Sequence, residues 1–285
     1  MGRTIAIVNQ KGGVGKTTTA VNLAAALDIA ERPTLLVDAD PQANTTRALG
    51  FAEDAERPSL YDSLVGGRPL TELELVCTDL PCLSVLPSDG ELVGAEVELV
   101  GAESREFRLA RQLDEIRDRF DFTFIDCPPS LGLLTLNALV AADGVLIPVQ
   151  CEYLALEGIS SLVETIKRVR AALNQRLEIE GVLMTMYDDR TNLARQVVEE
   201  VRAVFGDQVY ETLIPRNVRL GEAPSYGQPI FLYDIRSKGA EAYFKLAKEF
   251  LSHETKGVGQ GAAQPDPGSS TAQTTSGEDR ESIGH

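Results

Sequence analysis

The sequence predicts a doubly wound α/β fold, in which a mostly parallel, twisted sheet carries helices on both faces. Short apolar runs alternate with segments of helical periodicity as far as about residue 251. Two of these runs end in aspartate, at the strand ends where α/β sheets place their ligand sites. The chain has 285 residues and is 43% hydrophobic, which is enough for one large core.

A glycine-rich loop lies between the first predicted strand and the first predicted helix. Residues 9–18 read Asn-Gln-Lys-Gly-Gly-Val-Gly-Lys-Thr-Thr and follow the apolar run 5–8. Glycine tolerates positive φ, so successive backbone N–H groups can converge on phosphate oxygens at a helix N-terminus. Lys16 would reach the β- and γ-phosphates of a nucleotide, and the Thr17 hydroxyl would ligate Mg²⁺. The loop residues expected to bind the nucleotide are Lys11, Gly12, Gly13, Val14, Gly15, Lys16, Thr17 and Thr18.

Two further apolar runs end in aspartates. The run 34–37 is followed by Asp38-Ala39-Asp40, and the run 122–125 is followed by Asp126 and two prolines that prevent the strand from continuing. Because parallel strands end at the same edge of a sheet, we expect these carboxylates beside the phosphate loop. An isolated pair of loop aspartates could also cap the next helix.

The other elements follow from the spacing of apolar residues. Short apolar runs predict strands at 83–86, 144–149 and 181–187. Apolar residues at helical spacing predict helices from about residue 20 to 30, and near 59–64, 92–100, 107–116, 154–173 and 238–251. A further helix is expected to open in 187–197, and 214–227 is expected to be a loop that leads into another helix.

The chain changes character at Ser252. Residues 252–285 contain no aromatic side chain and are rich in Gly, Ser, Thr, Gln and Pro. We therefore expect one domain at 1–251 and a disordered polar tail at 252–285.

Composition restricts the function classes. The formal net charge of −16 argues against a generally basic nucleic-acid binder, so any DNA contact must come from a local arginine patch. No run approaches about 18 apolar residues and the N-terminus is already a core strand, so we expect a cytoplasmic protein with neither membrane span nor signal peptide. The cysteine spacing favours buried free thiols over a metal cluster. The four cysteines are Cys77, Cys82, Cys127 and Cys151.

Together these motifs resemble those of a known family. The segment KGGVGKTT with the additional Lys11, the run from Asp38 to Gln42, and the strand ending in Asp126 resemble the ParA/MinD group of P-loop ATPases, whose Walker A loop is deviant. The resemblance covers residues 3 to about 251 and implies the P-loop NTPase fold. It implies that Lys11 crosses to the nucleotide of a partner subunit, and that Asp40 positions the attacking water. It also places Asp38 near Mg²⁺ and gives Asp126 the role of holding that ion.

Two arginine-bearing segments, 187–197 and 214–227, match the ParA/Soj branch of this group. In that branch the residues matching Pro215 and Asn217 lie at the adenine, and arginines such as Arg190 and Arg219 touch DNA phosphates. A plain turn and a solvated helix face are the alternatives for these residues. No Asn-Lys of a guanine-binding loop occurs in the chain, which favours ATP.

The resemblance implies a nucleoid-associated DNA-segregation ATPase. It would bind ATP and Mg²⁺, form a sandwich homodimer, bind DNA without sequence preference and hydrolyse ATP when a ParB-like partner stimulates it. Since the first strand starts within the first few residues, we expect no preceding helix-turn-helix domain.

Three other classes share the loop. A MinD-like division regulator needs a basic amphipathic C-terminal helix, whereas residues 252–285 carry a net acidic charge and would not favour a membrane partner. A cluster-carrying electron-transfer protein needs paired cysteines, which the cysteine spacing of this chain does not favour. A tyrosine kinase of this kind needs a tyrosine-rich tail, whereas residues 252–285 contain no aromatic side chain.

Overall fold

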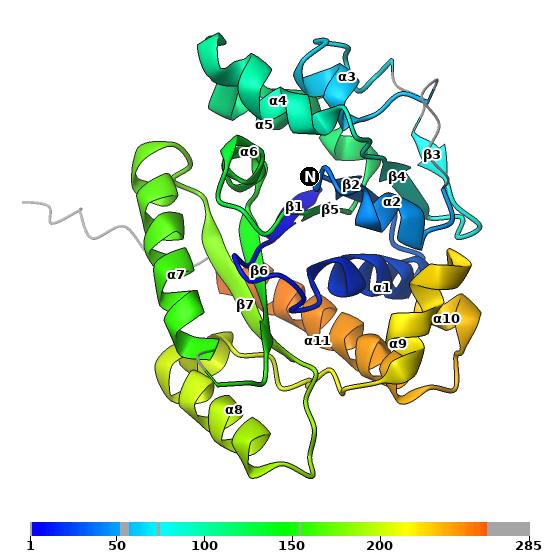
Figure 1. Cartoon of the computed structure of the whole chain (residues 1–285), viewed down its shortest axis with the longest axis vertical. Coiled ribbons are helices and arrows are strands. Elements are labelled where there is room, and N and C mark those ends of the chain that lie inside the picture. The colour runs from blue at the N-terminus through cyan, green and yellow to red at the C-terminus, as the bar shows by residue number, and fades with distance from the viewer. Residues whose placement is uncertain (1, 52–56, 73–74, 154, 261–285) are drawn as a thin grey trace, which may run out of the picture. The chain divides into compact units, whose positions relative to one another are not determined.

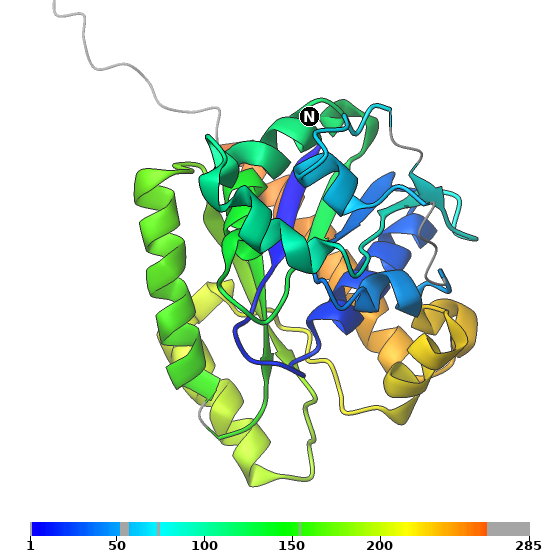
Figure 2. The same cartoon turned by 45° about the horizontal axis from the view of Figure 1, so that its top comes forward.

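The computed structural model contains one sheet with helices on both faces (Figures 1 and 2). Its strand order is β3-β4-β2-β5-β1-β6-β7, and every neighbouring pair is parallel except β3 with β4. The predicted fold class is therefore confirmed. The structure describes residues 2–51, 57–72, 75–153 and 155–260.

The chain divides into two compact units, Met1–Phe250 and Leu251–His285. The sheet and every site residue discussed below belong to the first unit. In the second unit the description ends at residue 260. Residues 252–260 of the predicted disordered tail 252–285 are helical, so the prediction is wrong there, and the part at 261–285 lies outside the described residues.

The strands form where the apolar runs predicted them, because side chains on both faces of a parallel sheet are buried. The first strand starts and ends slightly earlier than the predicted 5–8, and the last covers 178–185 instead of 181–187. The short β3 was not predicted. The strands are β1 (Arg3–Ile7), β2 (Thr34–Asp38), β3 (Val76–Cys77), β4 (Leu83–Leu86), β5 (Phe122–Asp126), β6 (Gly144–Gln150) and β7 (Glu178–Thr185).

Five helices differ from the sequence prediction. The predicted loop 214–227 contains the short helix α9, and α11 runs to Gln260 instead of ending at Leu251. α2, α6 and α10 were not predicted. The helices are α1 (Lys16–Ile29), α2 (Asn44–Ala48), α3 (Leu60–Leu64), α4 (Leu92–Glu98), α5 (Arg108–Asp114), α6 (Leu133–Ala141), α7 (Ala155–Ala172), α8 (Asn192–Phe205), α9 (Val218–Glu222), α10 (Ile230–Tyr233) and α11 (Lys238–Gln260). Within the described part of the chain, no helix is both long and apolar enough to cross a membrane.

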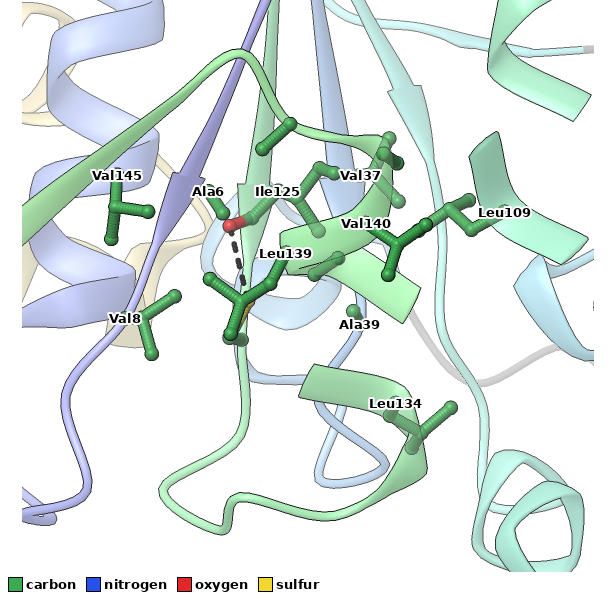
Figure 3. Packing of buried hydrophobic residues seen from close by; sticks show 14 of the residues in the cluster. Ala6, Val8, Val37, Ala39, Leu109, Ile125, Leu134, Leu139, Val140 and Val145 are labelled. Carbon is green, nitrogen blue, oxygen red and sulfur yellow. Dashed lines mark hydrogen bonds between the residues drawn. The ribbon is translucent and has the colours of Figure 1, made fainter. Parts of the chain in front are cut away.

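Alternating strand residues supply two cores. One face packs against α6 and its neighbours, and Ala6, Ile125 and Leu139 belong to its buried cluster (Figure 3). On the other face, the rings of Phe122 and Phe250 are 5.2 Å apart between centroids and join β5 to α11. This alternation follows from the two-residue period of a strand.

Two local predictions are only partly correct. Cys82, Cys127 and Cys151 are free thiols as predicted, but only Cys127 is fully buried. The apolar residues of the predicted helix 92–100 do not form a single buried face, since three valines are exposed while Leu92, Ala95 and Leu99 are buried. The exposed residues are Val93, Val97 and Val100.

Candidate nucleotide site

The glycine-rich loop leads directly into the N-terminus of α1. Gly13 and Gly15 adopt φ angles of 75° and 91°, which other residues rarely reach. Gly15 is the N-cap residue of α1, and neither a side-chain cap nor an acidic first-turn residue is present there. The free N–H groups of the first turn and the helix dipole therefore favour an anion at this position.

Two side-chain hydrogen bonds hold the loop against the neighbouring strands, and a third lies within the loop. Asn9 donates from Nδ2 to the Pro148 carbonyl at 2.7 Å and accepts the Lys11 N–H at 2.9 Å. The Thr185 hydroxyl donates to the Val14 carbonyl at 2.8 Å. The loop is thus fixed to β6 and β7 before any ligand binds, which lowers the entropy cost of ordering it around phosphates.

Asp126 lies at the end of β5 with one carboxylate oxygen satisfied and the other not. The hydroxyls of Thr17 and Thr45 each donate to Oδ2 at 2.7 Å. Oδ1 is buried and has no hydrogen-bond partner. Burial raises the pKa of Asp126 to about 6 despite both hydrogen bonds. A buried carboxylate oxygen without a donor suits a cation, so this donor set fits Mg²⁺, which takes one or two carboxylates together with substrate phosphates.

Asp38 lies next to Asp126 because the two residues pair in register on β2 and β5. Its Oδ2 accepts the backbone N–H and the hydroxyl of Thr46 at 2.8 and 2.7 Å. Its Oδ1 accepts the Asp40 N–H at 3.2 Å. Asp38 therefore connects β2 to α2 and to the segment that carries Asp40. Its predicted place in the Mg²⁺ site remains a prediction.

The buried aspartates should make the nucleotide-free protein less stable as pH rises. Burial, followed by the charge of Asp126, raises the pKa of Asp38 to about 7. The folded state then binds more protons than the unfolded state from the ordinary aspartate pKa up to about 7, so this contribution to stability is lost across that range. We expect Asp38→Asn to flatten the dependence. Urea unfolding at pH 5 and at pH 8 measures the free energy of unfolding of both proteins. An equal change in this free energy between the two pH values in both proteins would contradict the raised pKa of Asp38.

Two lysines of the loop have different surroundings. Lys16 is 7% exposed, and its Nζ lies 3.4 Å from the Lys11 carbonyl oxygen. Desolvation lowers the pKa of Lys16, while Asp126 acts in the opposite direction. The side chain of Lys11 is 52% exposed and forms an ion pair with Glu152. The sequence-predicted lysines are therefore both at the loop, one facing the carboxylates and the other turned toward α7.

A cavity of about 470 Å³ opens over the loop, within the size range of small-molecule sites. Among its lining residues are Gly12, Gly13, Gly15, Lys16, Thr17, Thr18, Asp40, Gln42, Asn44, Pro129 and Met186. A second pocket of about 360 Å³ contains Pro215 and Asn217 and shares Gly15, Thr18 and Met186 with the first. The structure thus brings the two residues predicted at the adenine next to the loop.

The two arginines predicted to contact DNA are exposed and paired with carboxylates. Arg190 donates from Nε and Nη2 to the two oxygens of Asp188 at 2.8 and 2.7 Å. Arg219 donates to Glu222 at 2.9 Å and lies 3.5 Å from Asp234. Neither arginine lines the cavity over the loop. Their role in DNA binding stays a prediction.

Sequence reasoning missed several residues that organise the site. Thr45 and Thr46 follow the Asp38–Gln42 run by a few positions, and hydroxyl residues after an acidic strand end were the signal that could have identified them. Asn9 and Glu152 each follow an apolar strand, but their partners are far away in sequence. Only the fold shows what these two side chains contact.

Comparisons with known proteins agree with this geometry. Residues 2–179 match the family described as an AAA domain (AAA_31). The chromosome partitioning protein ParA of Myxococcus xanthus is 57% identical over 255 residues, covering 90% of each chain. The sporulation initiation inhibitor protein Soj of Bacillus subtilis is 56% identical over 89% of this chain and 100% of its own.

A solved structure is also similar to this chain. Cobyrinic acid a,c-diamide synthase from Mycobacterium smegmatis, with bound ATP analog and magnesium, superposes with a TM-score of 0.79 at 39% identity. The match covers 90% of this chain and 97% of that protein. With relatives above half identity over nearly their whole length, the chain belongs to the ParA/Soj family of chromosome-partitioning ATPases.

Proposed function

We propose that this protein is an ATP-dependent DNA-segregation ATPase, whose ATP-bound sandwich dimer binds DNA without sequence preference. A ParB-like partner would stimulate hydrolysis and thereby reset the cycle. The observation that carries the proposal is the carboxylate of Asp126, which accepts the Thr17 and Thr45 hydroxyls beside the uncapped phosphate loop and keeps one oxygen free. Such an arrangement serves a nucleotide polyphosphate with its cation.

We assign the site residues to three groups, which would bind the phosphates, the adenine and the metal ion. The loop N–H groups and Lys16 bind the phosphates, and Pro215 and Asn217 bind the adenine. Thr17 and Asp126 would hold Mg²⁺, and Asp38 lies beside Asp126 on the neighbouring strand. When bound, Mg²⁺ supplies positive charge that neutralises the phosphate oxygens.

Hydrolysis requires a positioned water and charge stabilisation. Asp40 lines the cavity, is 7% exposed and is oriented by the Gln42 N–H, which donates to its Oδ1 at 2.9 Å. We assign it the orientation of the attacking water. The ammonium group of Lys11 in each protomer would contact the nucleotide bound by the other protomer. Hydrolysis would therefore depend on dimerisation.

The γ-phosphate would control the dimer through the segments that follow β2 and β5. Asp38 and Asp126 connect these segments to α2 by hydrogen bonds to Thr46 and Thr45. A ligand that contacts both aspartate-bearing segments can therefore order them together, and its hydrolysis releases them. We place the protein in the cytoplasm, on the nucleoid.

Sedimentation tests this cycle directly. The protein is spun with ATP, with ADP and without nucleotide, each with and without a duplex of arbitrary sequence. We expect a dimer with ATP, and duplex co-sedimentation in that sample alone. A protein that remains monomeric with ATP would contradict the proposal.

Arg190 and Arg219 should be required for DNA binding. At about 0.15 M salt the Debye length is about 8 Å, so distant carboxylates are largely screened and a local patch can bind phosphates. Dimerisation doubles the available contacts, which makes binding depend on ATP. We expect Arg190→Glu or Arg219→Glu to abolish duplex binding and to preserve ATP-dependent dimerisation.

Salt titration of duplex binding by fluorescence anisotropy measures this effect. The control is Arg168→Glu on α7, whose side chain is 81% exposed and pairs only weakly with Glu164, at 3.6 Å. Equal loss of binding in the control would show that net charge alone is responsible.

A further inference from the structure

Three valines remain exposed on the helical segment 92–101, which consists of α4 and the 3₁₀ turn that follows it. Val93, Val97 and Val100 recur at intervals of four and three residues, so they lie on one side of the segment and form what we call the valine stripe. They are 58%, 75% and 62% exposed, whereas the opposite side of the segment packs into the core. Apolar side chains gathered on one exposed helix face are typical of protein interaction surfaces.

The charged residues nearest to the valine stripe in the sequence are acidic. Three exposed glutamates flank it, namely Glu91, Glu98 and Glu103. Residues 88–104 contain no lysine or arginine. The next basic residue, Arg105, is already engaged, since its Nη1 donates to the Val100 carbonyl at 2.5 Å and its Nε pairs with Glu106 at 3.1 Å. The three glutamates therefore form an acidic rim, which favours a partner that is apolar on one side and basic at its edges.

A buried carboxylate connects this segment to α6. Glu96 lies on α4 between two of the valines, and its Oε1 is buried and has no hydrogen-bond partner among the described residues. This oxygen is so close to Gly132, the N-cap residue of α6, that a Cβ atom at Gly132 would collide with it. Figure 1 shows α4 next to α6. The carboxylate of Glu96 therefore rests directly against the start of α6.

The start of α6 is in turn joined to the nucleotide cavity. α6 has neither a side-chain cap nor an acidic residue in its first turn, so Glu96 supplies the negative charge that a helix N-terminus favours. The loop before α6 follows Asp126 and contains Pro129, which lines the cavity. The Thr135 hydroxyl of α6 donates to the Ser130 carbonyl of this loop at 2.6 Å. A displacement of α4 can therefore reach the cavity through Glu96, α6 and this loop.

We propose that the valine stripe with its acidic rim is the docking surface for a basic amphipathic helix of another protein, and that Glu96 couples this docking to ATP binding. The coupling rests on the proposed function, because it requires a nucleotide that orders the loop after Asp126. Docking onto a support that ATP has already ordered costs less conformational entropy, so each ligand strengthens the binding of the other by the same factor. Glu96 is a positioning residue, since it acts on the nucleotide site only through α6.

Charge selects this occupant over the others. The chain has a net charge of −16, so a second copy does not complement the three glutamates. Residues 261–285 contain four acidic residues and one arginine, and they do not complement the glutamates either. Anionic lipid and DNA are repelled for the same reason. A basic helix with one apolar side complements both the valines and the rim, in the manner of helices that bind in apolar grooves.

A model peptide tests the docking. It carries leucines at helical spacing on one side and lysines on the other, and a scrambled peptide of the same composition is its counterpart. Fluorescence anisotropy with the full-length protein should show binding of the ordered peptide alone, and Val97→Asn should weaken this binding about tenfold. Val204→Asn is the matched control, because Val204 is 64% exposed on α8, outside the segment.

Three results would overturn the docking surface. They are absence of binding by the ordered peptide, equal binding of both peptides, and equal losses in Val97→Asn and Val204→Asn. Loss of ATP-dependent dimerisation in Val97→Asn, measured by sedimentation, would assign the valine stripe to a second copy of the chain and would also overturn the proposal.

The second test breaks the contact between α4 and α6 from either side. Glu96→Ala removes the carboxylate, and Gly132→Ala adds a Cβ atom that displaces it. In the unmodified protein we expect the peptide to bind about five- to tenfold more tightly with ATP and Mg²⁺ than without nucleotide. Both variants should still bind the peptide but lose most of this difference. A difference that persists in both variants would overturn the role of Glu96.

The outcomes separate the inference from the proposed function. Absence of calorimetric ATP binding in the unmodified protein would contradict the proposed function and the coupling, whereas docking of the ordered peptide would still support the surface. If ATP binds but the peptide binds equally with and without it, the coupling is wrong and the ATPase assignment stands.

Discussion

Lys16→Ala will abolish measurable ATP binding. Lys16 is almost completely buried at the base of the loop, where Asp126 and Asp40 are the nearby charges that favour its ammonium form. Hydrogen bonds between charged groups contribute about 1.5–3 kcal/mol each, so loss of the ammonium should weaken binding about 100-fold or more. Isothermal titration calorimetry with ATP and Mg²⁺ measures the change.

The fold should survive this substitution. Desolvation is the largest influence on the Lys16 pKa, which means that the charge is held at an energetic cost in the nucleotide-free protein. We therefore expect Lys16→Ala to unfold at the same temperature as the unmodified protein or higher. Lys245→Ala is a suitable control, because Lys245 pairs with Glu241 on the surface of α11. Unchanged ATP affinity in Lys16→Ala would refute the loop assignment.

Lys11→Ala will leave ATP binding intact but reduce stimulated turnover by about 10³–10⁵, the range found where a cationic finger supplied in trans is removed. The half-exposed side chain of Lys11 makes its ion pair with Glu152. The loss should therefore appear in kcat, with little change in the ATP dissociation constant. Lys167→Ala, an exposed lysine of α7, is the control.

Mixing two inactive variants tests whether Lys11 acts across the dimer. A heterodimer of Lys11→Ala and Asp40→Ala contains one complete site, made from Asp40 of the first chain and Lys11 of the second. Turnover should therefore recover on mixing. Failure to recover, while both variants still form dimers with ATP, would show that Lys11 serves its own nucleotide.

Much of the site could be predicted from the sequence because its chemistry is contiguous. The segment from Lys11 to Thr18 contains the glycines, the lysine and the hydroxyls that a phosphate loop needs, and local backbone geometry suffices to place them. The strands that end in Asp38 and Asp126 were predictable for a similar reason. Each is a short apolar run, and parallel strands deliver their carboxyl ends to one edge.

Helix ends and partly exposed faces were predicted less well. The valines of the predicted helix 92–100 fall at apolar positions of its sequence, yet packing buries Leu92, Ala95 and Leu99 instead. α9 lies inside a segment rich in Pro, Asn and Gly, where local propensity favours a loop. Here contacts with the rest of the fold decide the conformation, since short helices are not stable by themselves.

The sequence by itself determined the fold class and the phosphate-binding loop, because both depend on periodicity and on residues adjacent in the chain. Only the tertiary structure decided which side chains meet from distant segments. Thr45 reaches Asp126 across the sheet edge, and Lys11 pairs with Glu152 at the start of α7. Such pairs join residues far apart in sequence, and no local pattern encodes them, because their proximity follows from strand order and helix packing.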